Sequence, residues 1–383
     1  MENLCKALKI KPLPCFGKVY QSAMEEYREK GTFIAEDMRI LEVIEEYGIM
    51  RKWEDDLLKA AAGIRKNENL LCFVYLLKHV LKLEDVFDEI LEMEFPENEE
   101  DTLVFDFATI FSAFSLIEDM KAHYKARHLP KEQFLESLLE FEIKADDFYH
   151  QYKRPGLKMH VLWLYKVIHG LVLRVGRLNF EIFKPFDAYV TVFESNRGEH
   201  EFLLSGECFS AMIIETDLAY IGIRSNVYDT EKREKVMLLK SEWKPILKRD
   251  DPIVSVHIPS CGKLLPELCE QSYTKMLSIL KTNYSDYKYK IFACEHSWLL
   301  DPHLTDFLSE SSNILAFQRK YSLYQNDATG KAVYDFLFFE PYSTPLEKLP
   351  EDTSLRRAIK NYYLGGGLIS EQGGLIFETK TEN

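Results

Sequence analysis

The chain has 383 residues, more than the roughly 250 to 300 over which a single hydrophobic core grows, so two domains are expected. Hydrophobic residues make up 46% and charged residues 29% of it, which excludes an intrinsically disordered chain. The formal net charge is −14 and no lysine and arginine block interrupts the acidic residues, which argues against a nucleic-acid-binding protein.

Neither an export signal nor a membrane span is indicated. The start, MENLCKALKIKPLPCFG, contains no continuous apolar segment, and the most apolar run, 161–175, is short and interrupted by Lys166 and His169. We therefore expect a cytoplasmic protein. The seven cysteines include no CxxC pair and are expected to be free thiols.

The N-terminal part is predicted to be helical, because apolar residues recur at helical spacing from 36 to about 145. Pro96 precedes a predicted helix at 101–125, and proline is common near the start of a helix. The segment Arg154-Pro155-Gly156 is the best candidate for a linker. The predicted domains are therefore 1–155 and 156–383.

After a further helix predicted at 158–174, the pattern changes to short runs of aromatic and β-branched residues, which are typical of strands. The predicted strands are 178–183, 187–195, 200–206, 219–226, 234–240, 253–258, 289–294, 314–324 and 374–379. Helices are predicted at 266–282, 302–309 and 354–367. The second half is therefore expected to be α+β.

The stretch VSVHIPSCGKLLPELCEQS, at 254–272, is predicted to run from a strand through a loop into a helix. Alternation places His257 on the face opposite the valines, at the end of its strand, where open sheets tend to bind ligands. The helix start after Pro266 offers N–H groups to a phosphate. A structural histidine and a plain corner of the fold remain equally open for His257 and its loop.

A second candidate site is FACEHSWLLDPHL, at 292–304, where His296 and Ser297 follow another strand. Cys261 and Cys294, taken with the two histidines, have the residue types of a zinc site or a Cys-His nucleophile, although no paired spacing supports either. A serine hydrolase is not indicated, because the GxSxG motif is absent.

Five stretches together resemble the bacterial acyltransferase domain-containing proteins of the GNAT type. They are LRVGRLNFEIF, HIPSCGKLLPELCEQS, HSWLLDPHL, SSNILAFQRKYSL and DTSLRRAIKNYYLGGGLISEQGGLIF. The resemblance implies an all-helical acyltransferase N-terminal domain followed by a GNAT-like domain with a mixed, bent β-sheet flanked by helices. It also implies that acetyl-CoA or a longer acyl-CoA lies between two adjacent strands, IVSVHI and YKIFAC.

The resemblance further implies the residues of the site. His257 is expected to be the general base, with Glu295 or His296 as substitutes, and Ser297 to donate a hydrogen bond to the leaving thiolate. The residues expected to bind CoA are Ile258, Ser260, Cys261, Gly262, Lys263 and Trp298. The family's pyrophosphate loop, Q/R-x-x-G-x-G/A, has no match here, where the loop reads SCGKL.

The leading hypothesis is therefore a GNAT-like N-acyltransferase that acts on a small-molecule or peptide amine, without a metal ion. The first alternative is a non-catalytic module of the same fold that senses an acyl-CoA or a peptide. The second is a thiol-dependent hydrolase that uses Cys261 or Cys294. The acceptor, the acyl chain length and the oligomeric state remain open.

Overall fold

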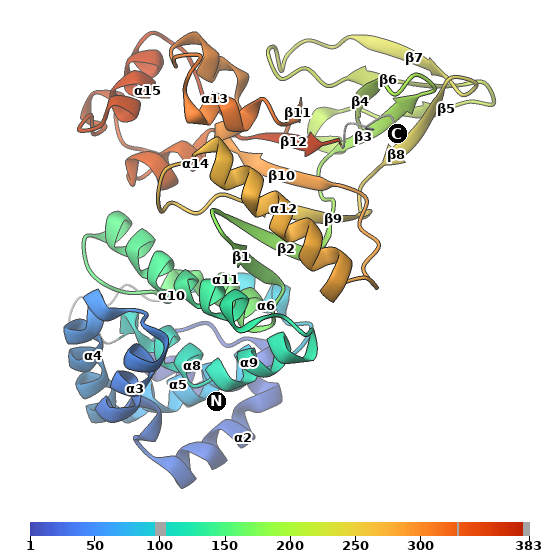
Figure 1. The fold of residues 1–383 in the computed structure, drawn as a ribbon. Helices are drawn as coiled ribbons and strands as arrows, with labels where there is room; N and C mark the ends of the chain where they lie inside the picture. The colour runs from blue at the N-terminus through green and yellow to red at the C-terminus, as the bar shows by residue number, and fades with distance from the viewer. Residues whose placement is uncertain (96–104, 328, 378–383) are drawn as a thin grey trace. The chain divides into compact units, whose positions relative to one another are not determined.

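The computed structural model of the protein describes residues 1–95, 105–327 and 329–377 (Figure 1). The chain divides into two compact units, Met1–Val175 and Gly176–Asn383. The division falls 20 residues after the boundary expected from the sequence, because helix α11 (Val161–Ile168) packs against α9 and α10 of the first unit.

Helices build the first unit. In chain order they are α1 (Glu2–Leu8), α2 (Pro14–Lys30), α3 (Asp37–Tyr47), α4 (Glu54–Lys66), α5 (Glu68–Leu81), α6 (Phe87–Leu91), α8 (Ala108–Phe114), α9 (Ile117–Ala126), α10 (Lys131–Tyr152) and α11, followed by strand β1 (Val172–Val175). Helix α5 contributes its apolar residues from Leu70 to Leu81 to the core, and every residue of α8 is buried. The predicted start of a helix at 101 lies outside the described residues.

The second unit combines strands with shorter helices. In chain order the elements are β2 (Leu178–Pro185), β3 (Val190–Ser195), β4 (His200–Leu204), β5 (Ile214–Glu215), β6 (Ala219–Arg224), β7 (Lys235–Leu239), β8 (Trp243–Leu247), β9 (Pro252–His257), α12 (Pro266–Asn283), β10 (Phe292–Ser297), α13 (Asn313–Gln318), β11 (Ser322–Tyr324), α14 (Lys331–Val333), α15 (Ser354–Leu364) and β12 (Gln372–Ile376).

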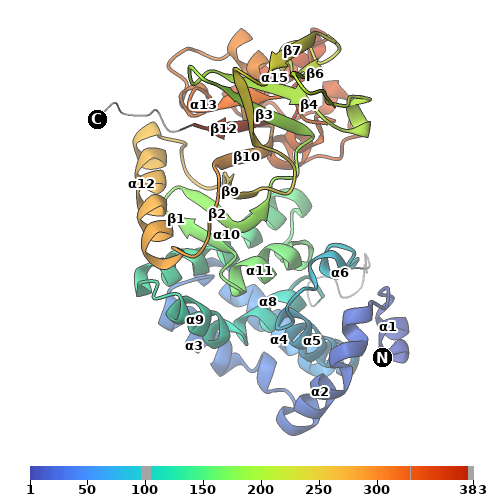
Figure 2. The same cartoon turned by 90° about the vertical axis from the view of Figure 1, so that its right-hand side faces the viewer.

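Two sheets organise the second unit. One contains the strands in the order β2-β9-β10-β12-β11, with β9 and β10 parallel and the other neighbours antiparallel. The other has the order β5-β6-β4-β3-β8, with β7 added to β6, and these strands lie together in Figure 2. Both sheets contribute to one apolar core, to which β3 gives Val192 and β9 gives Ile253. The predicted α+β class, helices first and then mixed sheets flanked by helices, is confirmed.

Two of the predicted elements have a different structure, and a strand lies where none was expected. The first five residues of the strand expected at 314–324 form helix α13, because Ser312 caps it by accepting a hydrogen bond from the N–H of Ile314. The end of the helix expected at 158–174 is strand β1, after Gly170 turns the chain at φ 64°. Strand β8 was not predicted, because Pro245 interrupts its pattern; it lies at the end of its sheet's strand order, where proline is tolerated.

None of the described helices combines the length and the apolar character that crossing a membrane requires.

Candidate active site

The two faces of strand β9 have different surroundings. Val256 pairs with Phe180 of β2, whose ring centre lies 5.7 Å from that of Tyr273 on α12, so this face packs against the helix. Ile253 on the other face joins the core between the sheets. Alternation places His257 on the face of Ile253, away from the valines.

Strands β9 and β10 are parallel neighbours over a short distance only. Val254 pairs with Phe292 and Ser255 pairs with Ala293, and within the described strands no further pair follows. Strand β9 nevertheless continues to His257 and β10 to Ser297. The two strands therefore part toward their C-terminal ends, where the loop after β9 leads to the start of α12.

His257, at the end of β9, contacts a buried carboxylate. Its Nε2 lies 3.0 Å from Oε2 of Glu181 on β2. The Glu181 side chain is 7% exposed and that of His257 is 34% exposed, so the ring reaches solvent while the carboxylate holds its orientation. Sequence reasoning missed Glu181; the signal was one acidic residue within LNFEI, whose residues are otherwise those of a buried strand.

Glu295 and Asp187 form a second pair of acidic residues. Glu295, on the diverging part of β10, accepts a hydrogen bond from the backbone N–H of Asp187 at 3.3 Å. Its second carboxylate oxygen is buried and has no hydrogen-bond partner among the described residues. Burial, together with the negative charge of Asp187, raises the pKa of Glu295 to about 8.

Asp187 is kept ionised by its surroundings. Lys184 Nζ donates a hydrogen bond to its Oδ2 at 2.6 Å, and His296 Nε2 lies 3.6 Å from its Oδ1. Burial opposes ionisation, but His296 and Lys184 outweigh it and hold the pKa of Asp187 well below its usual range. Two carboxyls with pKa values driven apart are a frequent feature of acid-base sites. Neither Asp187 nor Lys184 was predicted.

A β-bulge sets the position of His296. The pairing of β10 with β12 shifts between Cys294 and Ser297, and His296 within this shift has φ 54°, in the left-handed region. Its side chain is 53% exposed and lies beside Asp187. Ser297, the last residue of β10, is partly buried. The structure thus brings Glu295 and His296 together around Asp187.

The loop expected to bind CoA is held from one side by Arg177. Its guanidinium donates hydrogen bonds to the carbonyl oxygens of Pro259 at 3.1 Å, Gly262 at 3.2 Å and Lys263 at 3.0 Å. Gly262 has φ 70°, a conformation that glycine adopts without strain. With these carbonyls bound by a cation, the amide N–H groups of the loop and of the first turn of α12 are the ones suited to an anion. Arg177 was not predicted.

Trp298, which was expected to bind CoA, and Cys294, which was considered as a nucleophile, lie in apolar or buried surroundings. Trp298 packs against an apolar cluster built around Leu304 and Tyr363, so a place along the acyl channel stays a prediction. Cys294 is buried, and burial raises the pKa of its thiol to about 12, which disfavours a thiolate nucleophile. In the part of the chain that the structure describes, no group of three or more His, Cys, Asp or Glu side chains is arranged to hold a metal ion.

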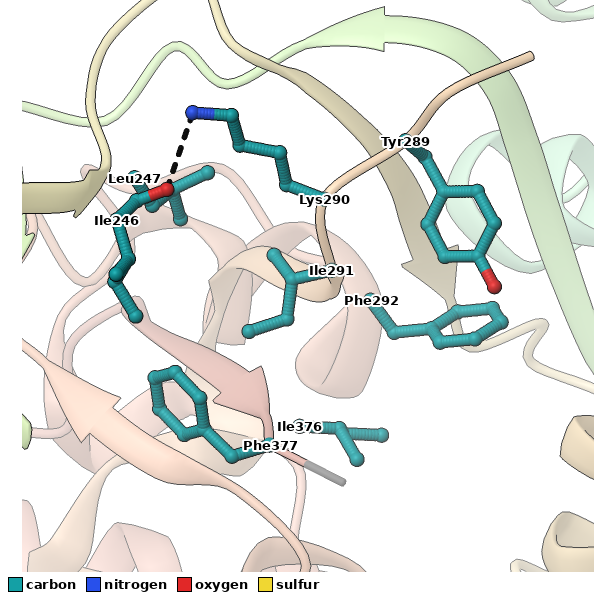
Figure 3. A pocket seen from close by; sticks show the side chains of 8 residues that line it. All are labelled: Ile246, Leu247, Tyr289, Lys290, Ile291, Phe292, Ile376 and Phe377. Atoms are coloured by element: carbon teal, nitrogen blue, oxygen red, sulfur yellow. Dashed lines mark hydrogen bonds between the residues drawn. The ribbon is translucent and has the colours of Figure 1, made fainter. Parts of the chain in front are cut away.

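A pocket of about 320 Å³ opens at the other end of β10 (Figure 3). It is lined by Ile246, Leu247, Tyr289, Lys290, Ile291, Phe292, Ile376 and Phe377. Lys290, its one charged lining residue, donates hydrogen bonds to the carbonyl of Ile246 at 3.1 Å and to Asp251 at 2.8 Å. None of the expected site residues lines this pocket.

Comparison with known proteins adds three findings. Residues 172–376 match the family model of the GNAT-like C-terminal domain. No curated protein matches the chain. The solved structures of similar fold include an acyltransferase in complex with decanoyl-CoA (17% identity, TM-score 0.61), one with CoA and 10C-teicoplanin (15%, 0.61) and one with decanoyl-CoA and teicoplanin (16%, 0.60); each match covers 88% of this chain and 86% of the other.

Proposed function

The chain belongs to the family defined by the GNAT-like C-terminal domain, and from this membership we propose that it transfers an acyl group from acyl-CoA to an amine. The observation that carries the proposal is the parting of β9 and β10 beside the start of α12. It gives an extended thioester a place between two strands and gives its phosphates the N–H groups of a loop and a helix start. The acyltransferases of similar fold that were solved with decanoyl-CoA support this choice of donor.

In the proposed reaction the amine nitrogen attacks the thioester carbonyl carbon. The new C–N bond forms, the C–S bond breaks, and the amine gives up a proton while the CoA thiolate takes one. A residue with a pKa near the working pH is best suited to accept the proton of the amine. The CoA thiolate would be protonated by the Ser297 hydroxyl or by water.

We assign the role of base to Glu295. Its pKa of about 8 lies near neutrality, and the geometry that supports the role is its place on the diverging part of β10, beside Asp187, from whose backbone N–H it accepts a hydrogen bond at 3.3 Å. Lys184 donates a hydrogen bond to Asp187, and His296 lies beside it, so the pKa of that neighbouring carboxylate stays low and it does not take the proton instead. His257, oriented by Glu181, is the second candidate for the same role.

The cosubstrate is assigned to the loop and helix after β9. Ile258, Ser260, Cys261, Gly262 and Lys263 would follow the pantetheine and pyrophosphate, and Arg177 would hold the loop in place. Two of the structures of similar fold contain teicoplanin or its 10C derivative. They suggest an acceptor larger than a free amino acid, with an amine on a peptide or glycopeptide.

Thermal unfolding with and without ligand tests the donor. CoA or decanoyl-CoA at millimolar concentration should raise the midpoint, because a ligand selective for the folded state stabilises it by mass action. Pantetheine, which lacks the nucleotide and the pyrophosphate, is the matched control and should have a smaller effect. No shift with any acyl-CoA would contradict the proposal. A shift without turnover over a broad panel of amines would favour the non-catalytic sensing module.

A further inference from the structure

Strand β7 lies at the margin of its sheet (Figure 1). It pairs antiparallel with β6, from Lys235 opposite Ile223 to Leu239 opposite Ala219. Within the described residues no strand pairs with its other side. An edge of this kind is a template for another strand, and many proteins blunt it with charged side chains, proline, a bulge or a cover. The pairing of β7 with β6 contains no bulge, β7 contains no proline, and its one charged residue, Lys235, stands at its start.

The hydrogen bonds between β7 and β6 show which residues of β7 direct their main-chain N–H and C=O groups toward the unpaired side of the strand. The N–H of Lys240 donates to the carbonyl of Leu218, and the carbonyl of Glu234 accepts from the N–H of Arg224, both at 2.8 Å. Because an antiparallel ladder alternates, the even-numbered residues from 234 to 240 bond to β6. The main-chain groups of the odd-numbered residues Lys235, Met237 and Leu239 therefore point outward.

The same odd-numbered residues carry an exposed apolar surface. The Met237 residue is 63% exposed and Leu239 is 39% exposed, whereas Leu238 on the opposite face is buried in a small core with Phe193. Met237 pairs with Ile221 of β6, which pairs in turn with the half-exposed Ile214 of β5. These three side chains form one row across the strands. Contiguous exposed apolar surface of this kind marks interaction sites.

We propose that β7 pairs antiparallel with β7 of a second copy of this chain, about a two-fold axis that passes Met237. Met237 then faces Met237 of the second copy, and Lys235 faces Leu239. Odd-numbered residues of one copy stand opposite odd-numbered residues of the other, so their outward N–H and C=O groups can form hydrogen bonds with each other. The row of Ile214, Ile221 and Met237 continues across the axis into its own copy, which buries the exposed surface from both sides.

Charge complementarity favours a second copy over an unrelated strand. In this register Glu234 stands opposite Lys240 of the second copy, and the reciprocal pair repeats on the other side of the axis. Within each chain, Lys240 Nζ lies 2.6 Å from Glu215 Oε1 and Glu234 Oε1 lies 2.5 Å from an Arg224 nitrogen. Pairing would join these two ion pairs into a row of alternating charge. The segment 234–240 thus contains both the acidic and the basic residue that the pairing of two copies requires.

Sedimentation of the full chain tests the proposal. Over about two decades of protein concentration, the mass should rise from 44.9 kDa toward twice that value. Met237→Lys places two ammonium groups opposite each other at the axis and should leave the chain monomeric. Met38→Lys, at a 73% exposed position of α3, is the matched control and should dimerise as the wild type does. A wild type that stays monomeric, or a Met237→Lys variant that still dimerises, would overturn the proposal.

Cross-linking tests the register. In a Cys208→Ser background, which removes an exposed thiol, Met237→Cys should form a covalent dimer as oxidised glutathione is reduced. Residues facing each other in a hydrogen-bonded pair have Cα atoms about 5.5 Å apart, within reach of a disulfide. Lys235→Cys and Leu239→Cys should cross-link when mixed but not when oxidised separately. Cross-linking no greater than in the Cys208→Ser background would contradict the two-fold pairing.

Discussion

The backbone N–H of Asp187 donates to Glu295, yet their carboxyls are driven to opposite protonation states. Lys184 and His296 lie beside Asp187, whereas Glu295 has burial and a negative neighbour. At neutral pH one carboxyl is therefore ionised and the other mostly carries a proton. The difference arises because Lys184 bonds directly to Asp187, whereas for Glu295 burial and the charge of Asp187 outweigh the more distant Lys184.

The pH dependence of acyl transfer should report this pair. The rate should rise with pH through about 8, as Glu295 ionises and becomes able to accept a proton. Asp187→Asn removes the negative charge that raises the pKa of Glu295, so the rise should move to lower pH. Glu295→Gln should lower kcat by about 10²-fold to 10⁴-fold. If Glu295→Gln keeps full activity and His257→Gln does not, the base is His257.

The free energy of unfolding should also depend on the protonation of Glu295, and it should decrease as the pH rises. The folded-state pKa of Glu295 is raised above its ordinary 4.5, so its favourable contribution is complete below that value and is lost as pH rises through about 8. Glu295→Gln should remove this loss, which amounts to a few kcal/mol at most. Urea unfolding of both proteins at pH 5 and pH 8 measures it. Equal declines in the two proteins would contradict the raised pKa.

Arg177→Lys should weaken the loop after β9. Lysine keeps the charge but has no planar fork to reach the carbonyls of Pro259, Gly262 and Lys263 together. The expected loss is about 1 to 3 kcal/mol of stability, with reduced affinity for acyl-CoA. Arg319→Lys is the control, since that exposed guanidinium bonds the carbonyl of Glu310 at 3.0 Å. Equal effects of the two substitutions would argue against a special role for Arg177.

Gly373→Ala should be strongly destabilising. An added Cβ at this position of β12 would lie 2.0 Å from Cζ of the buried Tyr324 on the neighbouring strand. Neither the ring nor the strand can move without disturbing the core, so we expect a loss of about 1 to 3 kcal/mol or more. Gly17→Ala in helix α2 is the matched control, because its nearest side-chain atom is 3.9 Å away. It should be neutral or stabilising by up to about 1 kcal/mol.

Local patterns of the sequence predicted those elements whose structure is decided locally. The run from IVSVHI through Pro266 into a helix and on to YKIFAC combines alternation, a turn and helix punctuation, and it folds as β9, α12 and β10. The segment ILAFQ was wrongly predicted as a strand. Its apolar residues suit either structure, and the cap at Ser312 together with tertiary packing selects the helix.

The surroundings of the candidate site could be predicted only in part. Glu295 and His296 were expected because they follow a strand next to the first candidate strand. Glu181, Asp187 and Arg177 lie between 76 and 108 residues away from their partners along the chain. Only the pairing of β2 with β9 and the packing of the chain bring these charged residues to the site. No local sequence pattern predicts contacts between residues so far apart in the chain.

The parting of β9 and β10 has a consequence for how this protein family diverges. Pantetheine contains two amide groups, which main-chain N–H and C=O groups can bind as they would bind a neighbouring strand. A site made of main-chain atoms places few demands on side-chain identity, so substitutions accumulate in it without changing its hydrogen-bonding capacity. Such a site is compatible with a fold retained at 15 to 17% identity to solved structures. A binding site of this kind depends on the course of the backbone more than on the identity of its side chains.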